Sequence, residues 1–573
     1  MDKKEVAAVL EEIANLLEMK GENPFKVRAF SNGVRIIENL SQDLSDLVTA
    51  HSLKKVKGIG EGLAQVITEL VQKGQSTYHL KLRSSVPEGL LELLDIQGLG
   101  PKRVKVLYEE LGIKNVGQLE YACQENRLLG LERFGEKLQK KILEAIKHRN
   151  KTKGYFLVSQ AMTDARGCVA YLGKQKGAAR IEIAGSLRRA NEIVHDIDIL
   201  VSTETPANIH RAFTSYPEVA DVLAHGETKS SVILKSGMQV DLRTVTERQF
   251  PYALYYFTGS KEHNVATRTL AKRMGLKINE YGIFKGKKLI PCRDEAGLFK
   301  VLGLHFIPPE LREQSGEIEA AQKGPLPELV KQEDIKGVFH VHSTYSDGGA
   351  PLADMIRAAL DLGYHYVGIS DHSKTAVYAN GLTEARVAKQ RAELDRLRKK
   401  FKPIRIFHGI ESDILPDGSL DYPDRVLREF DFVIGSIHSR FNMNEEEMTK
   451  RICRAMAHPA MTMWGHPTGR LLLGRAGYPV NYEAIFEAAR KNDVAIEINA
   501  NPHRLDLDWR FARAAKAKGL RFTINPDAHS REGLADVSYG VGIARKGWLE
   551  VGDVLNTMTV QQIERYLKNR SER

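Results

Sequence analysis

Cysteine and long apolar runs are scarce in this sequence. Its four cysteines among 573 residues lie far apart, at Cys123, Cys168, Cys292 and Cys453. This spacing excludes a disulfide framework and a cysteine-based zinc site, and it is typical of a reducing cytoplasm. No apolar run approaches the roughly 20 residues of a membrane span. The N-terminus lacks the apolar core of a signal peptide. We therefore expect a cytoplasmic protein with no membrane partner.

Acidic residues are outnumbered by basic ones. The chain has 84 Lys and Arg against 73 Asp and Glu, which gives a formal net charge of +11 at pH 7. An excess of positive charge favours binding to polyanions with an affinity that falls as salt rises. It can also simply serve solubility, so the partner has to be found from motifs. The length predicts several domains.

The most informative stretch runs from Gly185 to Val201. It begins with a Gly-Ser-Leu-Arg-Arg turn and continues into a β-forming run that contains Asp196 and Asp198. Residues i and i+2 of a strand point to the same face, so these carboxylates project together. Such a pair repels unless a cation lies between its members, and Mg²⁺ prefers carboxylates combined with phosphate oxygens. Asp241, in a second alternating strand at 239–243, supplies a third carboxylate.

Three carboxylates on neighbouring strands predict nucleotidyl transfer. They can hold two Mg²⁺ ions, which activate an attacking 3′-hydroxyl and stabilise the leaving pyrophosphate. Ser186 and Arg189 would hold the triphosphate, because the arginine fork suits phosphate oxygens. The alternative is a surface strand on which two aspartates happen to alternate. The upstream turn and the third aspartate favour catalysis.

Two glycine turns in the first 105 residues predict DNA binding. Gly58 with Gly60, and Gly98 with Gly100, each form an apolar-x-Gly-x-Gly turn that opens a helix; Lys102 follows the second. Glycine lets the backbone approach a ligand, and the helix start presents unpaired N–H groups to an anion. A tight turn between two helices is the alternative. The repetition favours a helix–hairpin–helix that grips the DNA backbone without reading the sequence.

Beyond residue 332, short apolar strands alternate with amphipathic helices. This rhythm predicts βα units, a parallel sheet and a barrel with its function at the C-terminal strand ends. Histidines and acids fall at those ends. The set is His340, His342, Asp347, His372, Glu411, His438, His466, Asp527 and His529. A lone histidine is more often part of a core, but six of them with three acids predict a multinuclear metal site. Mixed imidazole and carboxylate ligands suit Zn²⁺, Mn²⁺ or Fe.

The stretch from Gly185 to Asp241 resembles the palm of family X DNA polymerases, the group that includes polymerase beta. The Tyr-Phe-Thr-Gly-Ser run at 256–260 resembles that family's sugar-checking turn. Asn264 and Arg268 fall where the family places groups that face the minor groove of the nascent base pair. The resemblance implies a nucleotide site made of Gly185, Ser186, Arg189, Tyr256, Phe257, Gly259 and Asn264. It implies DNA contacts by Gly58, Gly60, Gly98, Gly100, Lys102 and Arg268.

The nine-residue set resembles the PHP (polymerase and histidinol phosphatase) domain, which has a distorted seven-stranded barrel and up to three metals. Asp347 stands where relatives can have histidine. Asp371 and Glu497 are not assigned as ligands, and each could orient a histidine. Where a PHP domain is joined to a bacterial family X polymerase, the resemblance implies 3′→5′ exonuclease activity. It also implies incision at abasic sites as a further activity. The alternatives are a phosphatase for a free metabolite, a structural metal site, and a DNA-end-binding scaffold with both sites idle.

One position departs from the family pattern. Some members carry a lysine in the helix after the first glycine turn, and that lysine forms a Schiff base with an abasic sugar. The corresponding residue here is Val66, which cannot act as a nucleophile. We predict that lyase activity by this route is absent or is carried by another lysine.

The predicted fold is multidomain: helical helix–hairpin–helix domains, an α/β (α+β) nucleotidyltransferase palm and thumb, and a C-terminal distorted (β/α)7 PHP barrel. The predicted segments are an N-terminal lyase-like domain (1–80), a fingers-like subdomain (81–149), palm (150–247), thumb (248–315), linker (316–332) and PHP domain (333–573). The implied cofactors are two Mg²⁺ in the palm and Zn²⁺ or Mn²⁺ in the PHP site. We expect a bacterial, nucleoid-associated monomer that binds gapped or primer–template DNA at 3′ ends, together with dNTPs, in repair.

Overall fold

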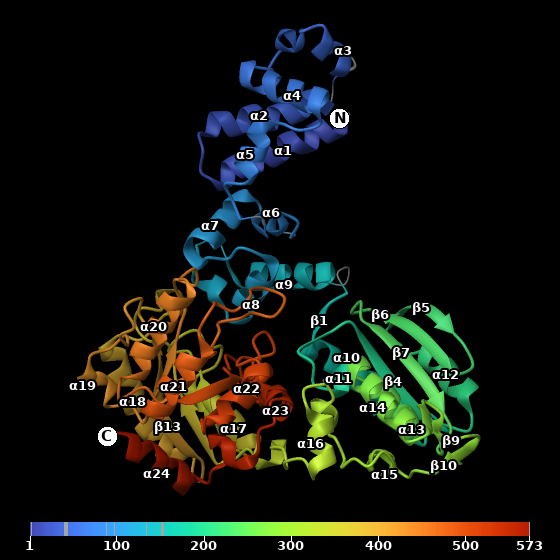
Figure 1. The fold of residues 1–573 in the computed structure, drawn as a ribbon. Helices are drawn as coiled ribbons and strands as arrows, with labels where there is room; N and C mark the ends of the chain where they lie inside the picture. Colours follow the sequence, from blue (N-terminus) through green and yellow to red (C-terminus); the bar gives the residue numbers. More distant parts are fainter. Residues whose placement is uncertain are drawn as a thin grey trace. The chain divides into compact units, whose positions relative to one another are not determined.

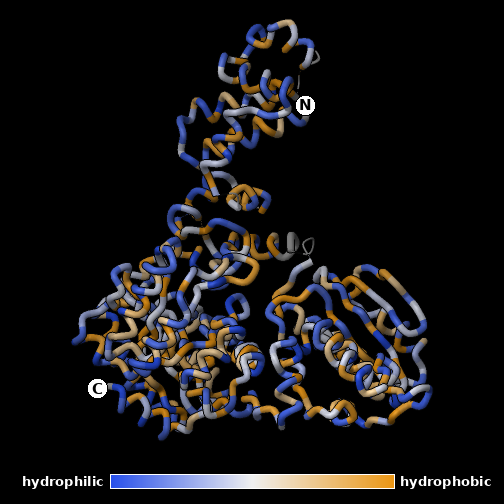
Figure 2. The backbone as a smooth tube through the Cα atoms, viewed as in Figure 1, coloured by the Kyte–Doolittle hydropathy of each residue, from blue (hydrophilic) through white to orange (hydrophobic). Residues whose placement is uncertain are grey.

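The structure is a computed structural model that describes residues 1, 3–38, 40, 44–87, 89–96, 98–132, 134–150 and 154–571. The chain forms two compact units, Met1–Ile146 and Lys147–Arg573. Each has its own buried apolar clusters, and hydrophobic stretches (orange in Figure 2) occur throughout both. None of the helices in the described ranges is both long enough and apolar enough to cross a bilayer. The four cysteines are free thiols.

The smaller unit is built from helices (Figure 1). They are α1 (Lys3–Met19), α2 (Pro24–Glu38), α3 (Leu44–Thr49), α4 (Glu61–Lys73), α5 (Thr77–Arg83), α6 (Gly89–Leu94), α7 (Pro101–Leu111), α8 (Val116–Gln124) and α9 (Glu136–Asn150). Leu10, Ile13 and Leu17 recur at helical spacing on α1 and are fully buried. α4 and α7 start directly after Gly60 and Gly100, which are their N-caps.

The larger unit begins with a mixed sheet in the order β2-β4-β7-β6-β5. Its strands and helices are β2 (Arg180–Ile183), β4 (Asp196–Ser202), β5 (Val219–His225), β6 (Lys229–Leu234), β7 (Gln239–Val245), α10 (Val158–Leu172), α11 (Gly185–Arg188) and α12 (Pro206–Thr214). A separate ribbon pairs β1 (Phe156–Leu157) with β3 (Ile193–Val194). β4 and β7 are parallel, and the other pairs of the sheet are antiparallel.

The side chains of β4 alternate between the hydrophobic core and the face of the sheet that carries the acidic residues. Ile197 and Ile199 are buried in the cluster to which α10 and α12 contribute. Asp196 and Asp198 alternate with them and therefore point to the opposite face. On that face Leu200 packs in a small cluster with Phe250 of α13 (Phe250–Thr258). The sheet thus has one closed face and one face that carries the acids.

The next segment packs around α13. It contains α14 (Lys261–Arg273), the antiparallel sheet β10-β9-β8 and α15 (Glu295–Val301). The strand bounds are β8 (Leu276–Asn279), β9 (Gly282–Lys285) and β10 (Lys288–Ile290).

Residues 316–332, which we predicted to be a linker, are folded. They include α16 (Glu317–Lys323), whose Ile318 and Ala321 are buried in the cluster that holds Leu298. Glu317 is fully buried and lies 2.7 Å from His263 Nδ1. The charged and turn-rich composition suggested an open connection, but the few apolar side chains in this segment are spaced so that they reach the core.

The C-terminal part is a seven-stranded parallel barrel in chain order, from β11 to β17. The strands are β11 (Gly337–Val341), β12 (Tyr366–Ile369), β13 (Arg405–Asp413), β14 (Phe432–Ser436), β15 (Met463–Trp464), β16 (Ala495–Asn499) and β17 (Phe522–Asn525). The helices are α17 (Leu352–Asp361), α18 (Glu384–Lys400), α19 (Asp424–Leu427), α20 (Glu445–Met456), α21 (Tyr482–Asn492), α22 (Trp509–Ala517), α23 (Val537–Lys546) and α24 (Val560–Ser571). A bridge between Val341 and Ala528 brings the two ends of the sheet together. The predicted distorted barrel is confirmed.

Candidate active sites

The three predicted palm acids lie on adjacent strands. Asp198 on β4 stands directly opposite Asp241 on β7 in parallel register, and Asp196 precedes it by two residues. Burial and, after it, the two neighbouring carboxylates together raise the pKa of Asp198 to about 7. Lys229 Nζ lies 2.6 Å from Asp241 and lowers the pKa of that carboxyl against the effect of burial. The three carboxylates outnumber Lys229 and Arg243, the two cations that act on them, and this excess of negative charge suits divalent cations.

Gly185 brings the arginine turn against these acids. Its φ is +63°, and a Cβ atom there would lie 2.2 Å from Asp198 Oδ2. Only glycine combines this backbone conformation with so close an approach. The turn that contains Ser186 therefore begins at the carboxylate. The structure thus places Gly185 against Asp198.

Arg189 has two partners outside the turn. Its Nε donates to Glu313 at 3.0 Å and Nη1 donates to the Thr258 carbonyl at 2.6 Å. Its side chain is 12% exposed. Arg188 forms a bidentate pair with Glu295 at 2.6 and 3.1 Å. Both arginines thus tie the turn to the segment after α13. The contact of Arg189 with a triphosphate stays a prediction.

The remaining predicted nucleotide residues gather where α13 meets α14. The half-buried rings of Tyr256 and Phe257 pack edge to face, with centroids 5.2 Å apart. Gly259 ends α13 at a φ of +68°. Asn264 Nδ2 donates to the Tyr256 carbonyl at 2.8 Å, and Arg268 Nε donates to the Asn264 carbonyl at 3.1 Å. The five residues form one cluster.

In the smaller unit the two glycine turns have matching geometry. Gly58 and Gly98 each have a φ of +97°. The spaces around Gly60 and Gly100 are open, since a Cβ atom there would meet nothing within 4 Å. Lys102 is exposed in the first turn of α7. Each helix start is therefore accessible to an anion.

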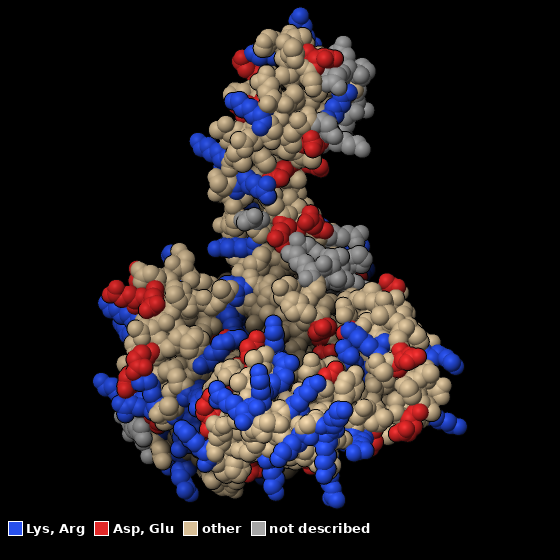
Figure 3. Space-filling model, turned by 45° about the vertical axis from the view of Figure 1, so that its right-hand side comes forward, with Lys and Arg blue, Asp and Glu red and all other residues tan. Residues whose placement is uncertain are grey.

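Lys and Arg side chains also gather on the face of the larger unit shown in Figure 3.

Val66, at the position where relatives can carry a lysine, lines a cavity of about 550 Å³ in the smaller unit. Gly58, Tyr78 and Lys26 also line it. The Nζ of Lys26 lies 5.1 Å from the centroid of the Tyr78 ring, and Tyr78 raises the pKa of this amine. A protonated amine is a poor nucleophile. That lyase activity by the route of this position is absent, or is carried by another lysine, stays a prediction.

The nine predicted PHP ligands converge at the C-terminal ends of the barrel strands. Their potential ligand atoms form overlapping groups, and within each group all atoms lie within 4.8 Å of one another. The groups are His342, Asp347, His372 and His529; His340, His466 and Asp527; His340, His342 and Glu411; and His372, Glu411 and His438. Every predicted ligand takes part. The overlap means that single residues, such as Glu411, can bridge two ions.

The electrostatics of this cluster fit cations. Glu411 lies 2.9 Å from both His372 and His466 and is 1% exposed. Burial opposes its ionisation, but His372 and the neighbouring imidazoles outweigh it and hold the pKa of Glu411 well below its usual value. Burial lowers the pKa of His342 to about 3, which keeps that imidazole neutral. His342 Nε2 and both Asp347 oxygens are buried without a hydrogen-bond partner in the described part of the chain. Unpaired buried atoms of this kind are satisfied by a metal.

Carboxylates behind the cluster orient its histidines. Glu497 accepts a hydrogen bond from His340 Nδ1 at 2.6 Å, which agrees with the prediction that it orients a histidine. Asp371 accepts hydrogen bonds from Ser343, Ser346 and Gln390. Ser346 Oγ also lies 3.5 Å from His342 Nδ1, and the role of Asp371 in orienting a histidine stays a prediction.

Sequence reasoning missed Asp413, which lies 2.5 Å from His438 Nδ1. Its position two residues after Glu411 was the available signal, because such residues share one face of a strand.

Comparison with known families defines the class. Residues 1–76 match the model of a helix–hairpin–helix domain, 90–148 that of a SAM-like helix–hairpin–helix tandem, 253–313 that of the DNA polymerase beta thumb and 339–501 that of the PHP domain. Together with the three-acid sheet and the nine-residue cluster, these matches describe a nucleotidyltransferase joined to a PHP metal centre.

Known proteins specify this class further. The chain is 41% identical to the "DNA polymerase/3′-5′ exonuclease PolX" of Bacillus subtilis over 99% of its own length and 100% of that protein. The chain therefore belongs to the family X DNA polymerases that carry a C-terminal PHP domain. It is also 31% identical to an African swine fever virus "Repair DNA polymerase X" over 23% of the chain and 80% of that protein. A "Probable phosphatase" of Caldanaerobacter subterraneus is 28% identical over 41% of the chain and 91% of that protein.

Proposed function

We propose that this protein fills gaps in DNA during base excision or end-joining repair and removes 3′-terminal nucleotides with its PHP domain. The observation that carries the proposal is the presence of two complete sites in one chain, the three acids on β4 and β7 and the nine-residue cluster. The name of the B. subtilis relative joins the same two activities.

In the polymerase, Asp196, Asp198 and Asp241 would hold two Mg²⁺ ions, which activate a 3′-hydroxyl and stabilise pyrophosphate. The chain's own residues do the positioning. Gly185 and Ser186 place the turn beside the acids, and Arg189 binds the triphosphate once it leaves Glu313. Tyr256 and Phe257 face the sugar. Arg268 lies along the minor groove, and the glycine turns with Lys102 hold the DNA backbone.

In the PHP domain, the nine residues would hold up to three Zn²⁺ or Mn²⁺ ions, which supply an activated hydroxide and bind the phosphate. Glu497 and Asp413 hold His340 and His438 in the orientation that leaves their second ring nitrogen free for a metal. Cleavage of a phosphodiester at a 3′ end follows, with incision at abasic sites as a further reaction of the same centre.

The remaining parts of the proposal concern organisation. The domains run 1–80, 81–149, 150–247, 248–315 and 333–573, joined by 316–332. The protein acts as a monomer near the nucleoid of a bacterial cytoplasm and uses gapped or primer–template DNA and dNTPs.

A phosphatase is the second candidate for the PHP site, and the similarity to the C. subterraneus protein favours it. A 3′-recessed duplex and histidinol phosphate, offered separately to the enzyme with Mn²⁺, distinguish the two. We expect cleavage of the duplex at a rate at least about 100-fold above that of the phosphate ester, because binding energy from the rest of the DNA is used in the transition state. The opposite preference would establish the phosphatase and refute the nuclease.

The two activities are tested together on a duplex with a one-nucleotide gap and a 5′-labelled primer. With Mg²⁺ and dNTPs the primer should lengthen, and with Mn²⁺ and no dNTPs it should shorten. A primer that lengthens but never shortens would leave the polymerase assignment intact and give the PHP cluster another substrate or a structural role.

A further inference from the structure

A buried lysine of the PHP domain reaches the arginine turn of the polymerase. Lys546 is the last residue of α23, and its side chain is 1% exposed. Its Nζ donates to the Arg189 carbonyl at 3.0 Å, to Asn191 Oδ1 at 2.8 Å and to Glu313 at 2.5 Å. An ammonium has three donors, and all three are used. The lysine is thus completely satisfied by groups of the polymerase.

Glu313 lies between two cations. One of its oxygens, Oε1, accepts from Lys546 Nζ and also from Arg189 Nε at 3.0 Å. Arg189 belongs to the polymerase turn, whereas Lys546 belongs to the PHP barrel, so this carboxylate connects the two halves of the larger unit. Its side chain is 16% exposed, so an unpaired charge there would be poorly hydrated.

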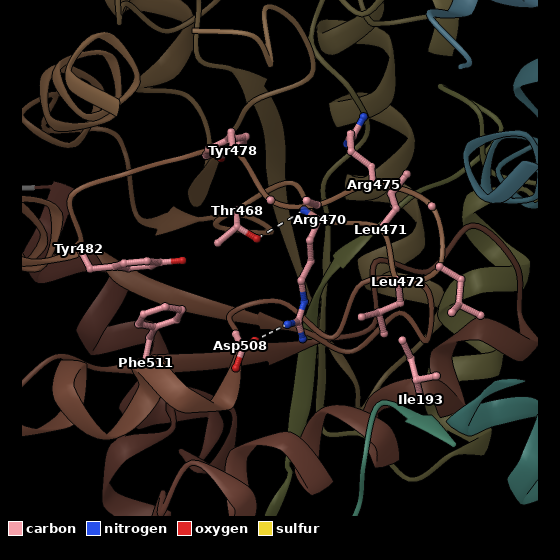
Figure 4. A pocket seen from close by; sticks show the side chains of 14 residues that line it. Ile193, Thr468, Arg470, Leu471, Leu472, Arg475, Tyr478, Tyr482, Asp508 and Phe511 are labelled. Carbon is pink, nitrogen blue, oxygen red and sulfur yellow. Dashed lines mark hydrogen bonds and ion pairs between the residues drawn. The ribbon is translucent and has the colours of Figure 1, made fainter. Parts of the chain in front are cut away.

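A second PHP cation holds the residues that follow the turn. Arg470 Nη2 lies 3.3 Å from Glu192, and Nη1 lies 2.6 Å from Asp508 (Figure 4). Ile193, next in sequence to Glu192, lines a cavity of about 620 Å³ together with the PHP loop 468–478. The segment from Arg189 to Ile193, which leads into the catalytic strand β4, is therefore held by the PHP domain at two places.

We propose that Lys546 is a positioning residue for DNA synthesis, acting through Glu313 on Arg189. In this proposal Arg189 releases Glu313 when it turns toward a triphosphate, because Glu313 and the Thr258 carbonyl hold its Nε and Nη1 in the structure. With Lys546 in place, Glu313 keeps a cation when Arg189 leaves, and the turn keeps its shape through the bonds to Arg189 O and Asn191. Without Lys546, Arg189 would be the one charged partner left to Glu313 among the described residues. Glu313 would then hold Arg189 in place. The inference rests on the proposed role of Arg189 at the triphosphate.

The test compares Lys546→Met with Arg545→Met. Arg545 is the adjacent residue and joins the same two parts, through Glu310 at 2.7 Å and the Val330 carbonyl at 3.1 Å, but it has no bond to the turn. Single-nucleotide insertion into gapped DNA gives KM for the dNTP and kcat. Lys546→Met should raise KM about tenfold, a common size for coupling between neighbouring charges. Arg545→Met should leave KM within about twofold of wild type.

Suppression distinguishes release of Arg189 from general loosening of the interface. In the double variant Lys546→Met/Glu313→Gln, the carboxylate that retains Arg189 is gone, so KM should return to within about threefold of wild type. A merely structural lysine would make the double variant as poor as the single one or worse. That result would overturn the proposal, as would an equal effect of Arg545→Met or an unchanged KM in Lys546→Met.

Exonuclease activity on a single-stranded 3′ end, measured for every variant, shows whether the PHP domain is folded. If Lys546→Met has lost exonuclease activity, Lys546→Gln replaces that variant. The glutamine amide lacks the charge but can still donate to the Arg189 carbonyl and to Asn191 Oδ1. The same rise in KM is expected, and a wild-type KM would overturn the proposal. A wild-type enzyme that inserts no nucleotide would instead refute the proposed polymerase function itself.

Discussion

At the scale of residues, the chemistry of each side chain follows from the groups that lie close to it. Asp198 carries a pKa of about 7 because it is buried beside two carboxylates, and cations relieve that repulsion. Gly185 allows the arginine turn to approach the same carboxylate. Glu411 unites the PHP cluster because its two oxygens lie near histidines from several strands. The next two predictions address single positions of this kind.

Gly185→Ala should abolish DNA synthesis and leave degradation intact. The new methyl group would meet Asp198 Oδ2 at 2.2 Å, so the turn or the carboxylate has to move. We expect primer extension to fall at least about 100-fold, since ångström displacements at a reacting centre have that effect. Gly275→Ala is the matched control, with a φ of +70° and open space around it. It should cost about 1 kcal/mol in stability and leave extension unchanged. Normal extension by Gly185→Ala would contradict the assigned site.

Glu497→Gln should weaken the PHP centre selectively. A glutamine can turn its NH₂ group toward His340 Nδ1 and cannot stabilise the metal-bound imidazole as a carboxylate does. Loss of such an orienting group lowers metal affinity or activity about 10- to 100-fold. Exonuclease rates titrated against Mn²⁺ measure the effect, and primer extension should be unchanged. Wild-type exonuclease activity at limiting Mn²⁺ would show that Glu497 has no orienting role.

Much of both sites could be predicted from the sequence, because the ligands follow local rules. Asp196 and Asp198 share a strand face by spacing, and the histidines follow apolar strands. The partners of Arg189 could not be predicted, since Glu313 lies 124 residues away and is brought near only by tertiary packing. The partners of Asp371 could not be predicted either, because its position beside His372 does not reveal that its carboxylate faces the Ser343 loop.

At the scale of elements, the glycine turns position helix starts for DNA. α4 and α7 follow Gly60 and Gly100 with open space around each N-cap. The alternation of apolar strands and amphipathic helices beyond residue 332 was enough to predict the barrel. A two-residue strand such as β15 shows no periodicity of its own. The segment that forms α16 was mistaken for a linker, because a seven-residue helix among charged residues has too few apolar positions to be recognised.

Lys102→Ala should weaken DNA binding without changing sequence preference. The side chain is exposed at the start of α7, beside the accessible N–H groups. Loss of one phosphate contact should reduce the slope of log K against log salt by about 1. Fluorescence anisotropy on gapped duplexes at several salt concentrations measures this slope. Lys73→Ala, at the C-terminal end of α4, is the control and should leave the slope unchanged. Equal slopes for all three proteins would refute the hairpin contact.

At the scale of the whole molecule, the larger unit joins two metal-dependent sites through a network of buried ion pairs. The Lys546 bonds connect residues up to 357 positions apart, which no local pattern in the sequence reveals. The order of domains was nevertheless predictable, because each carries its own motif. The two sites use separate residues, so a substitution of a residue in one site should leave the activity of the other site unchanged.

Metal removal should destabilise the barrel. Without ions, the buried His342 and Asp347 atoms have no hydrogen-bond partner among the described residues. Dialysis against a chelator should release more than one ion per chain and lower the melting temperature, and Mn²⁺ should restore both. Elemental analysis and calorimetry measure this. An unchanged melting transition with no metal released would mean that the cluster holds no structural ion.

The most direct test of the central claim is a reciprocal comparison of Asp198→Ala and His342→Ala on one 5′-labelled gapped duplex. Extension with dNTPs and shortening without them are measured for both variants. The account predicts that Asp198→Ala abolishes extension and keeps shortening, while His342→Ala does the reverse. Loss of both activities in either variant, with the fold intact, would contradict two independent sites in one chain.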